Sequence, residues 1–368
     1  MKQAVGVEPA RRRTHAVQVG ALTLGGGAPV RIQSMTKTDT GDVGATVRQA
    51  RALERAGCEI VRVAVPGHDA VAAFAKIRAR VSLPLVADIH FDHRLAIACI
   101  DAGADKVRIN PGNIGGTRRM QEVARRAGLS GCAIRVGVNA GSLEKDLQVK
   151  HGGATPAALV ESAVRAVADL EAVGFRSIVV SLKASNVLHT IAAYRLAARA
   201  LHYPLHLGVT EAGWGLAGIV KSSVGMGALL ADGIGDTLRV SLTDTPVQEV
   251  RVAREILSSV GLRRTGVEII SCPTCGRCGV DLQRTARAVR SRLSDITTPL
   301  TVAVMGCPVN GPGEAKAADF GLAGGKGKAV IFSRGKILKT VPESRMIDAL
   351  VAAVREQSGN RGRDEGRG

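Results

Sequence analysis

Residues 59–65 read EIVRVAV, a short run with alternating valines that is typical of a buried β-strand. Similar runs recur up to residue 243 and are separated by alanine-rich helical segments such as TVRQARALERAG (46–57). Alternating strands and helices imply a parallel sheet, and eight units within about 250 residues predict a closed (β/α)₈ barrel of the TIM type. The eight runs are VRIQSM (30–35), EIVRVAV (59–65), PLVADIH (84–90), KVRINPG (106–112), AIRVGVN (133–139), SIVVSLK (177–183), LHLGVTEAG (205–213) and TLRVSLT (237–243).

Alternation within these strands predicts which side chains face the interior of the barrel. In IVRVA (60–64), the valines are expected to pack against the outer helices, so Arg62 points inward. The same argument places Arg108, Arg135 and Arg239 inside, and Lys183 ends the sixth strand. Active sites of such barrels form at the carboxyl ends of the strands, where this chain also places Gln33, Ser34, Asp88, His90, Asn110, Asn113, Asn139, Ser181, Thr210 and Glu211.

The predicted barrel interior carries more positive than negative charge. Asp88 and Glu211 are the clearest inward acids, against four arginines and one lysine. A buried arginine usually has an internal partner, and each unpaired buried charge costs several kcal/mol. A ligand with two or more negative charges, such as a diphosphate, would remove that cost.

Composition excludes several classes of protein. Lys and Arg exceed Asp and Glu by 50 to 32, for a net charge of +18, yet aromatic residues make up only 2%, so stacking platforms for single-stranded nucleic acid are nearly absent. No run of about 18 apolar residues and no signal-peptide core is found. We therefore expect a cytoplasmic protein that binds neither nucleic acid nor membrane.

A change of pattern predicts a second domain. Residues 1–255 form the expected substrate-binding barrel, residues 256–358 read as a compact α+β module, and GNRGRDEGRG (359–368) reads as a disordered tail.

Four of the seven cysteines lie in the second domain. Cys272 and Cys275 form a C-x-x-C motif after a predicted strand, and Cys307 follows another strand. Structural zinc with Cys278 as the fourth ligand is one interpretation. An iron–sulfur cluster is the other, and it is favoured beside a polyanion-binding barrel because it can supply electrons. The turn NGPGE (310–314) can return Glu314 to the metal as a weaker, displaceable ligand, although Glu314 can equally be a surface turn residue.

The chain closely resembles the bacterial 4-hydroxy-3-methylbut-2-enyl diphosphate synthases of the non-mevalonate isoprenoid pathway. The resemblance runs from about residue 15 to residue 325, and its last two motifs together are highly specific. The matching strings include QSMTKTDTGD (33–42), PLVADIHFD (84–92), DKVRINPGNIG (105–115), IRVGVNAGSLEKD (134–146), SSVGMGALLADGIGDTLRVSLT (222–243), SCPTCGR (271–277) and GCPVNGPGEA (306–315).

This resemblance implies a barrel joined to a [4Fe–4S] domain that opens 2-C-methyl-erythritol 2,4-cyclodiphosphate with two electrons and loss of water. It implies a ferredoxin or flavodoxin as electron donor and a homodimer whose protomers share each active site. A zinc-containing, redox-inert barrel that binds a pterin or a phosphosugar is the alternative. The implied cluster ligands are Cys272, Cys275, Cys307 and Glu314, without Cys278; the implied substrate ligands are Arg62, Arg108, Arg135, Asn139, Lys183, Arg239 and Asn310; and Glu211 is the implied proton donor.

Overall fold

The computed structural model describes residues 9–264, 266–307 and 315–364, with the side chains of the last helix described to residue 357. The chain divides into two compact units, one ending at Arg263 and the other beginning at Arg264. None of the described helices is both long enough and apolar enough to cross a membrane.

The first unit is built around eight parallel strands in the spatial order β8-β7-β6-β5-β4-β3-β10-β9. A bridge between Val180 and Leu205 joins the two ends of this order and closes the barrel. All eight predicted strands are present, so the predicted barrel is confirmed. Their bounds are β3 (Arg31–Met35), β4 (Ile60–Ala64), β5 (Leu85–Asp88), β6 (Lys106–Ile109), β7 (Ala133–Asn139), β8 (Ile178–Lys183), β9 (His206–Leu207) and β10 (Thr237–Leu238).

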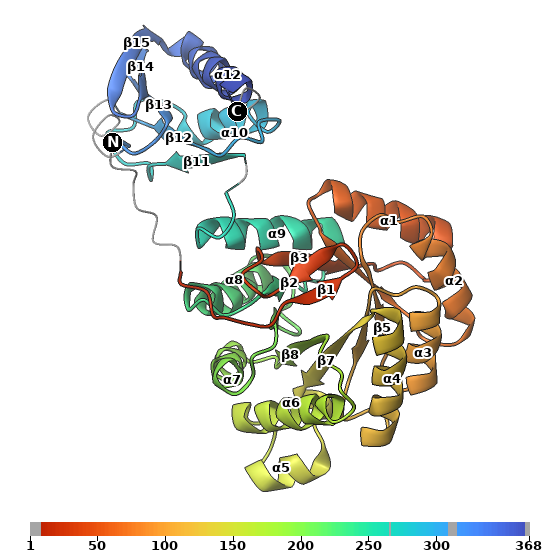
Figure 1. Ribbon diagram of the computed structural model, residues 1–368. Helices are drawn as coiled ribbons and strands as arrows, with labels where there is room; N and C mark the ends of the chain where they lie inside the picture. The colour runs from red at the N-terminus through yellow and green to blue at the C-terminus, as the bar shows by residue number, and fades with distance from the viewer. Residues whose placement is uncertain (1–8, 265, 308–314, 365–368) are drawn as a thin grey trace. The chain divides into compact units, whose positions relative to one another are not determined.

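Helices surround the barrel, as Figure 1 shows. Outward residues of the strands, such as Val61 and Val63, are fully buried against the inner faces of these helices, which contribute residues such as Leu53 and Phe74. Asp42 and Thr155 are among the N-cap residues that accept a hydrogen bond from the first turn of their helix. The helices are α1 (Val43–Arg55), α2 (Asp69–Arg78), α3 (His93–Asp101), α4 (Thr117–Ser130), α5 (Lys145–His151), α6 (Pro156–Glu171), α7 (Val187–Ala200), α8 (Gly215–Ala231) and α9 (Pro246–Ser259), with a 3₁₀ turn η1 (Ala140–Ser142).

A hairpin that was not predicted closes the amino-terminal end of the barrel. Its strands are β1 (Val17–Val19) and β2 (Leu22–Leu24). Their buried residues pack against Ile60, Val86 and Val179, which are the lowest inward residues of their strands. Because this end is sealed by apolar contacts, ligands can reach the interior at the carboxyl ends of the strands.

The second unit is a five-stranded sheet in the order β11-β12-β13-β14-β15, with α10 and α12 packed on its core. The first three strands are parallel, and the last three are antiparallel. The last helix continues through Asp364, into the segment where we expected a disordered tail. The elements are β11 (Val267–Ser271), α10 (Leu282–Arg292), β12 (Leu300–Met305), β13 (Phe320–Gly325), β14 (Lys328–Ser333), β15 (Lys336–Pro342), η2 (Glu343–Arg345) and α12 (Met346–Asp364).

Candidate active site

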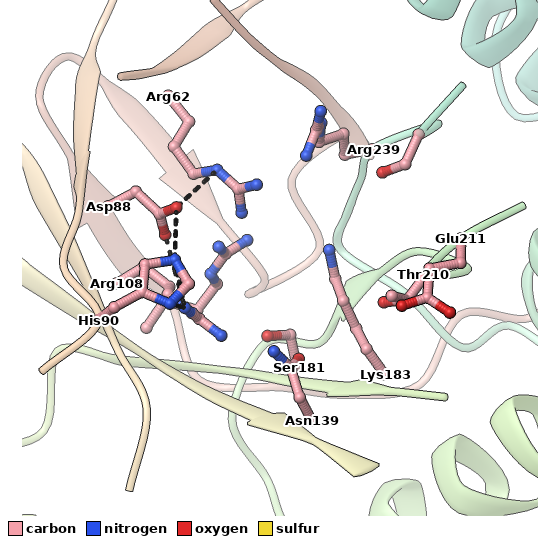
Figure 2. Close-up of a pocket in the computed structure, with 12 residues that line it drawn as sticks. Arg62, Asp88, His90, Arg108, Asn139, Ser181, Lys183, Thr210, Glu211 and Arg239 are labelled. Carbon is pink, nitrogen blue, oxygen red and sulfur yellow. Dashed lines mark hydrogen bonds and ion pairs between the residues drawn. The ribbon is translucent and has the colours of Figure 1, made fainter. Parts of the chain in front are cut away.

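A polar cavity of about 230 Å³ opens at the carboxyl ends of the barrel strands. Figure 2 shows that side chains from strands far apart in the sequence point into the same space. All four arginines predicted from strand alternation line it, together with Lys183, Asn139 and Glu211. The lining residues are Arg62, Asp88, His90, Arg108, Arg135, Asn139, Ser181, Lys183, Thr210, Glu211, Arg239 and Ser241.

Asp88 is the buried acid at the centre of one side of this cavity. Its carboxylate lies 3.9 Å from Arg62 Nε and 3.7 Å from Arg108 Nη1, and it is 3.3 Å from Nε2 of His90. Burial alone would raise the pKa of Asp88, but Arg62, the His90 hydrogen bond and Arg108 hold it well below its usual range. Asp88 therefore stays ionised and fixes two guanidinium groups at the cavity wall.

Arg135 and Lys183 make no ion pair with any residue in the described part of the chain. The Arg135 side chain is almost fully buried, and its Nε and Nη1 have no hydrogen-bond partner among those residues. Burial and the neighbouring Arg62 and Arg108 lower its pKa well below the usual value. Because buried donors normally have partners, these orphaned N–H groups indicate an anion-binding cavity.

Glu249 is a residue of this region that sequence reasoning missed. It lies in the first turns of α9 with 1% of its surface exposed, and its carboxylate is 3.0 Å from Lys37 Nζ and 3.6 Å from Arg239 Nη2. It also accepts hydrogen bonds from Ser34 Oγ and the Leu242 N–H. Burial and Arg62 lower the pKa of Arg239 to about 10, and Glu249 opposes them. The pattern of residues along α9 does not by itself indicate that Glu249 contacts Arg239 of the barrel.

Two inward residues could have been found by extending the strand alternation. Ser241 follows Arg239 by two positions and lines the cavity. Lys106 precedes Arg108 by two positions, is fully buried, and its amine has no partner among the described residues. His206 is fully buried beside these cations, and burial followed by Arg135, Lys183 and Lys106 lowers its pKa well below the usual value.

Gly137 makes room for a cavity arginine. A Cβ atom on Gly137 would lie 2.6 Å from Arg108 Nε, so any side chain there would displace the guanidinium. Asn139 follows on the same strand and accepts a hydrogen bond from Arg108 at 3.0 Å when its amide is oriented to satisfy both polar atoms. Glu211 stands exposed at the rim with φ of 55°, an uncommon backbone conformation for a residue other than glycine.

Two of the predicted cluster ligands lie just after the carboxyl ends of two neighbouring parallel strands. Cys272 directly follows β11 and Cys307 lies two residues after β12, which is its parallel neighbour. Cys272 Sγ accepts a hydrogen bond from the Gly306 N–H at 3.4 Å. The exposed Cys275 has a lowered pKa, chiefly because of hydrogen bonds from the backbone and then the side chain of Arg277. Stabilised thiolates are the donors that iron–sulfur clusters use, so this donor set fits such a cluster.

Cys278 makes different contacts from those of Cys272 and Cys275. Its thiol donates to the Val280 carbonyl at 3.2 Å, and its sulfur would lie 2.5 Å from a Cβ atom built on Gly306. Among the described residues, no three Cys, His, Asp or Glu side chains are grouped to hold a single metal ion. Asn310 and Glu314 lie outside the described residues.

The three cysteines of the barrel are buried and reduced. Burial raises the pKa of Cys58, Cys99 and Cys132 to about 12 in each case. Thiols of this kind are chemically inert at neutral pH.

Comparison with known proteins matches both units to one family. Residues 14–254 match the GcpE TIM-barrel domain, and residues 268–356 match the GcpE protein C-terminal domain. The chain belongs to the GcpE family. Its relatives include proteins named 4-hydroxy-3-methylbut-2-en-1-yl diphosphate synthase (flavodoxin) from Thermodesulfovibrio yellowstonii, with 54% identity over 94% of this chain and 99% of the relative, and from Listeria monocytogenes, with 53% identity over 92% of each. A solved dihydropteroate synthase from Xanthomonas albilineans covers 67% of this chain and 98% of its own at 12% identity, with a TM-score of 0.47.

These matches confirm the predicted family and the predicted pairing of a barrel with a smaller domain. As a GcpE family member, the chain carries its arginine cavity in the matched barrel and its late cysteines in the matched C-terminal domain. The individual roles predicted for the site residues stay proposals.

Proposed function

We propose that the chain reductively opens 2-C-methyl-D-erythritol 2,4-cyclodiphosphate to (E)-4-hydroxy-3-methylbut-2-enyl diphosphate in the non-mevalonate isoprenoid pathway. The observation that carries this proposal is the convergence of four arginines and Lys183 on one cavity. The chain also shares more than half its residues with relatives named 4-hydroxy-3-methylbut-2-en-1-yl diphosphate synthase (flavodoxin). The ring C–O bond to the diphosphate breaks, a hydroxyl leaves as water, and two electrons and a proton are consumed.

Each cavity residue has a role that follows from its chemistry. Arg62, Arg108, Arg135 and Arg239 donate hydrogen bonds to phosphate oxygens, for which the guanidinium fork is suited. Asn139 and Lys183 add donors to the same anion, and Asn310 is assigned a substrate contact by motif position alone. Glu211 stands at the rim, where it can donate a proton to the departing oxygen.

Cys272, Cys275, Cys307 and Glu314 would hold a [4Fe–4S] cluster. When bound, the cluster supplies electrons one at a time and a Lewis-acidic iron. The Gly306 N–H beside Cys272 and the Arg277 groups beside Cys275 stabilise the thiolate form that ligation needs. The hydrogen bond from Cys278 to Val280 supports its exclusion from the ligand set.

The proposed partners follow from charge and exposure. The relatives carry flavodoxin in their names, and we infer that flavodoxin, or the similarly acidic ferredoxin, docks on this chain of net charge +18. One face of α8, with the residue before the helix, exposes four large apolar side chains: Trp214, Leu216, Val220 and Val224. An apolar face of this kind supports a homodimer. The reduced thiols and these electron carriers fit a cytoplasmic enzyme.

The deciding experiment is anaerobic reconstitution with iron and sulfide, followed by assay with the cyclic diphosphate and a strong reductant. The linear diphosphate, identified by mass spectrometry, is the expected product. Glu211→Gln should retain cluster absorbance and substrate binding but lose turnover, and Cys307→Ser should lose the absorbance. Cys278→Ser is the matched control and should retain both. A colourless protein that holds only zinc and forms no product would contradict the proposal.

A further inference from the structure

Lys183 occupies an unusual place in the cavity wall. It is the last residue of β8, pairs in register with Asn139 of β7, and is half-buried. Its amine lies beside Gly208, the residue after β9. A Cβ atom built on Gly208 would be 3.5 Å from Nζ and 3.4 Å from Cε of Lys183. The Lys183 side chain reaches into the cavity, as Figure 2 shows.

The charged groups that face Lys183 are almost all cationic. Asp88 is already shared by Arg62 and Arg108, and Glu249 by Arg239 and Lys37. Glu211 lines the same cavity at its exposed rim, and His90 lies beside Asp88. No ion pair joins Lys183 to any acid of the described chain. The basic groups around it come from five other strands or the residues that follow them: Arg62 of β4, Arg108 of β6, Arg135 of β7, His206 of β9 and Arg239 after β10.

These surroundings disfavour a charged amine in the empty cavity. Burial, followed by Arg62, Arg135, Arg239 and Arg108, lowers the pKa of Lys183 well below its ordinary value. Guanidinium groups keep their protons in proteins, whereas a lysine amine can release its proton when repelled. Among the arginines and lysine that line the cavity, Lys183 is therefore the residue that can become neutral.

We propose that Lys183 takes up a proton as the cyclic diphosphate enters the cavity, so that substrate binding and proton uptake are coupled. This inference rests on the proposed function. Two phosphate charges within about 4–6 Å of the amine favour its ammonium form. The ligand itself cannot supply the change, because each of its phosphorus atoms carries a single strongly acidic hydroxyl that is ionised throughout the neutral range.

The coupling has a definite sign. Proton uptake means that affinity for the cyclic diphosphate rises as pH falls, by about tenfold per pH unit between the pKa of the amine in the empty cavity and its pKa in the complex. Below both values the dependence disappears, because the amine is then charged before the ligand arrives.

Isothermal titration calorimetry tests the coupling with the holoenzyme, its cluster oxidised and no reductant present, so that the cyclic diphosphate binds without turnover. Titrations at pH 8.5 in buffers of different ionisation enthalpy give the number of protons taken up as the slope of observed enthalpy against buffer enthalpy. The expected slope is about +1 for the unaltered protein. Binding with a slope of zero would overturn the coupling alone, whereas no binding at all would overturn the proposed function together with it.

Three variants assign the proton to a residue. Lys183→Arg carries a permanent charge, so the slope should fall to zero. Lys106→Met removes the other buried amine, which lies one level deeper and does not line the cavity, and should keep the slope. His90→Gln should also keep it. If the Lys183→Arg variant does not bind the cyclic diphosphate, the pH dependence of Kd is measured in Lys106→Met and His90→Gln instead. Loss of that pH dependence in either variant contradicts the assignment of the proton to Lys183.

Discussion

Substitution of Asp88 by asparagine tests the charge balance of the cavity. The change keeps the shape of the side chain and its hydrogen bond to His90 but removes the charge that lies 3.9 Å from Arg62 and 3.7 Å from Arg108. At an effective dielectric of about 20, each ion pair is worth about 4 kcal/mol before the cost of burying the carboxylate is subtracted. Removing one member of a buried set of this kind costs about 3–5 kcal/mol.

Differential scanning calorimetry of the ligand-free protein measures this loss. For a unit of this size, about 1 kcal/mol corresponds to a change of about 2–4 °C in Tm, so Asp88→Asn should lower the barrel transition by about 10 °C. Asp92→Asn is the matched control, because Asp92 caps α3, is 44% exposed and pairs with an exposed His68. Asparagine caps a helix equally well, so the control should change Tm by no more than about 2 °C.

The pH dependence gives a second check on the same variant. The pKa of Asp88 is lowered in the folded protein, so its contribution is fully present above the unfolded value of about 3.9 and is lost as pH falls through the folded value. The difference between wild type and Asp88→Asn should be constant from about pH 6 to 8. A loss smaller than about 1 kcal/mol at neutral pH, or equal losses in both variants, would refute the argument that Asp88 holds the two arginines.

Three further outcomes are expected. Gly137→Ala places a methyl group 2.6 Å from Arg108 Nε and should weaken cyclic diphosphate binding about tenfold by calorimetry, whereas Gly141→Ala, with no atom within 4 Å, should not. Glu249→Gln leaves Arg239 without its buried partner and should destabilise the barrel by about 3 kcal/mol. Glu59→Gln should cost less, because the Glu59 carboxylate is 20% exposed where it pairs with Arg31 and Arg263; equal losses would contradict this. Val220→Glu on α8 should yield monomers in analytical ultracentrifugation, and Val149→Glu, on the exposed side of α5, should not.

The barrel could be predicted from the sequence because its signals are local. Period-two alternation around Arg62, Arg108, Arg135 and Arg239 reflects a strand with one face toward helices and one toward the interior, so each strand carries its own orientation. Once the sheet closes into a barrel, these inward side chains necessarily meet in one cavity, so no contact between distant residues has to be predicted separately. Ser241 and Lys106 follow from the same rule applied to neighbouring positions.

Contacts between distant segments were decided only by the tertiary structure. Glu249 lies on an outer helix and meets Arg239 and Lys37 because α9 packs against β3, a juxtaposition that no local pattern encodes. The hairpin of β1 and β2 is too short to give a periodic signal, and it is stabilised by apolar residues of four other strands. The charge state of Lys183 likewise depends on four arginines separated from it by up to 121 positions in the chain, between residues 62 and 183, because electrostatic repulsion acts through space. The sequence by itself determined which residues face inward, and packing decided which of them have partners.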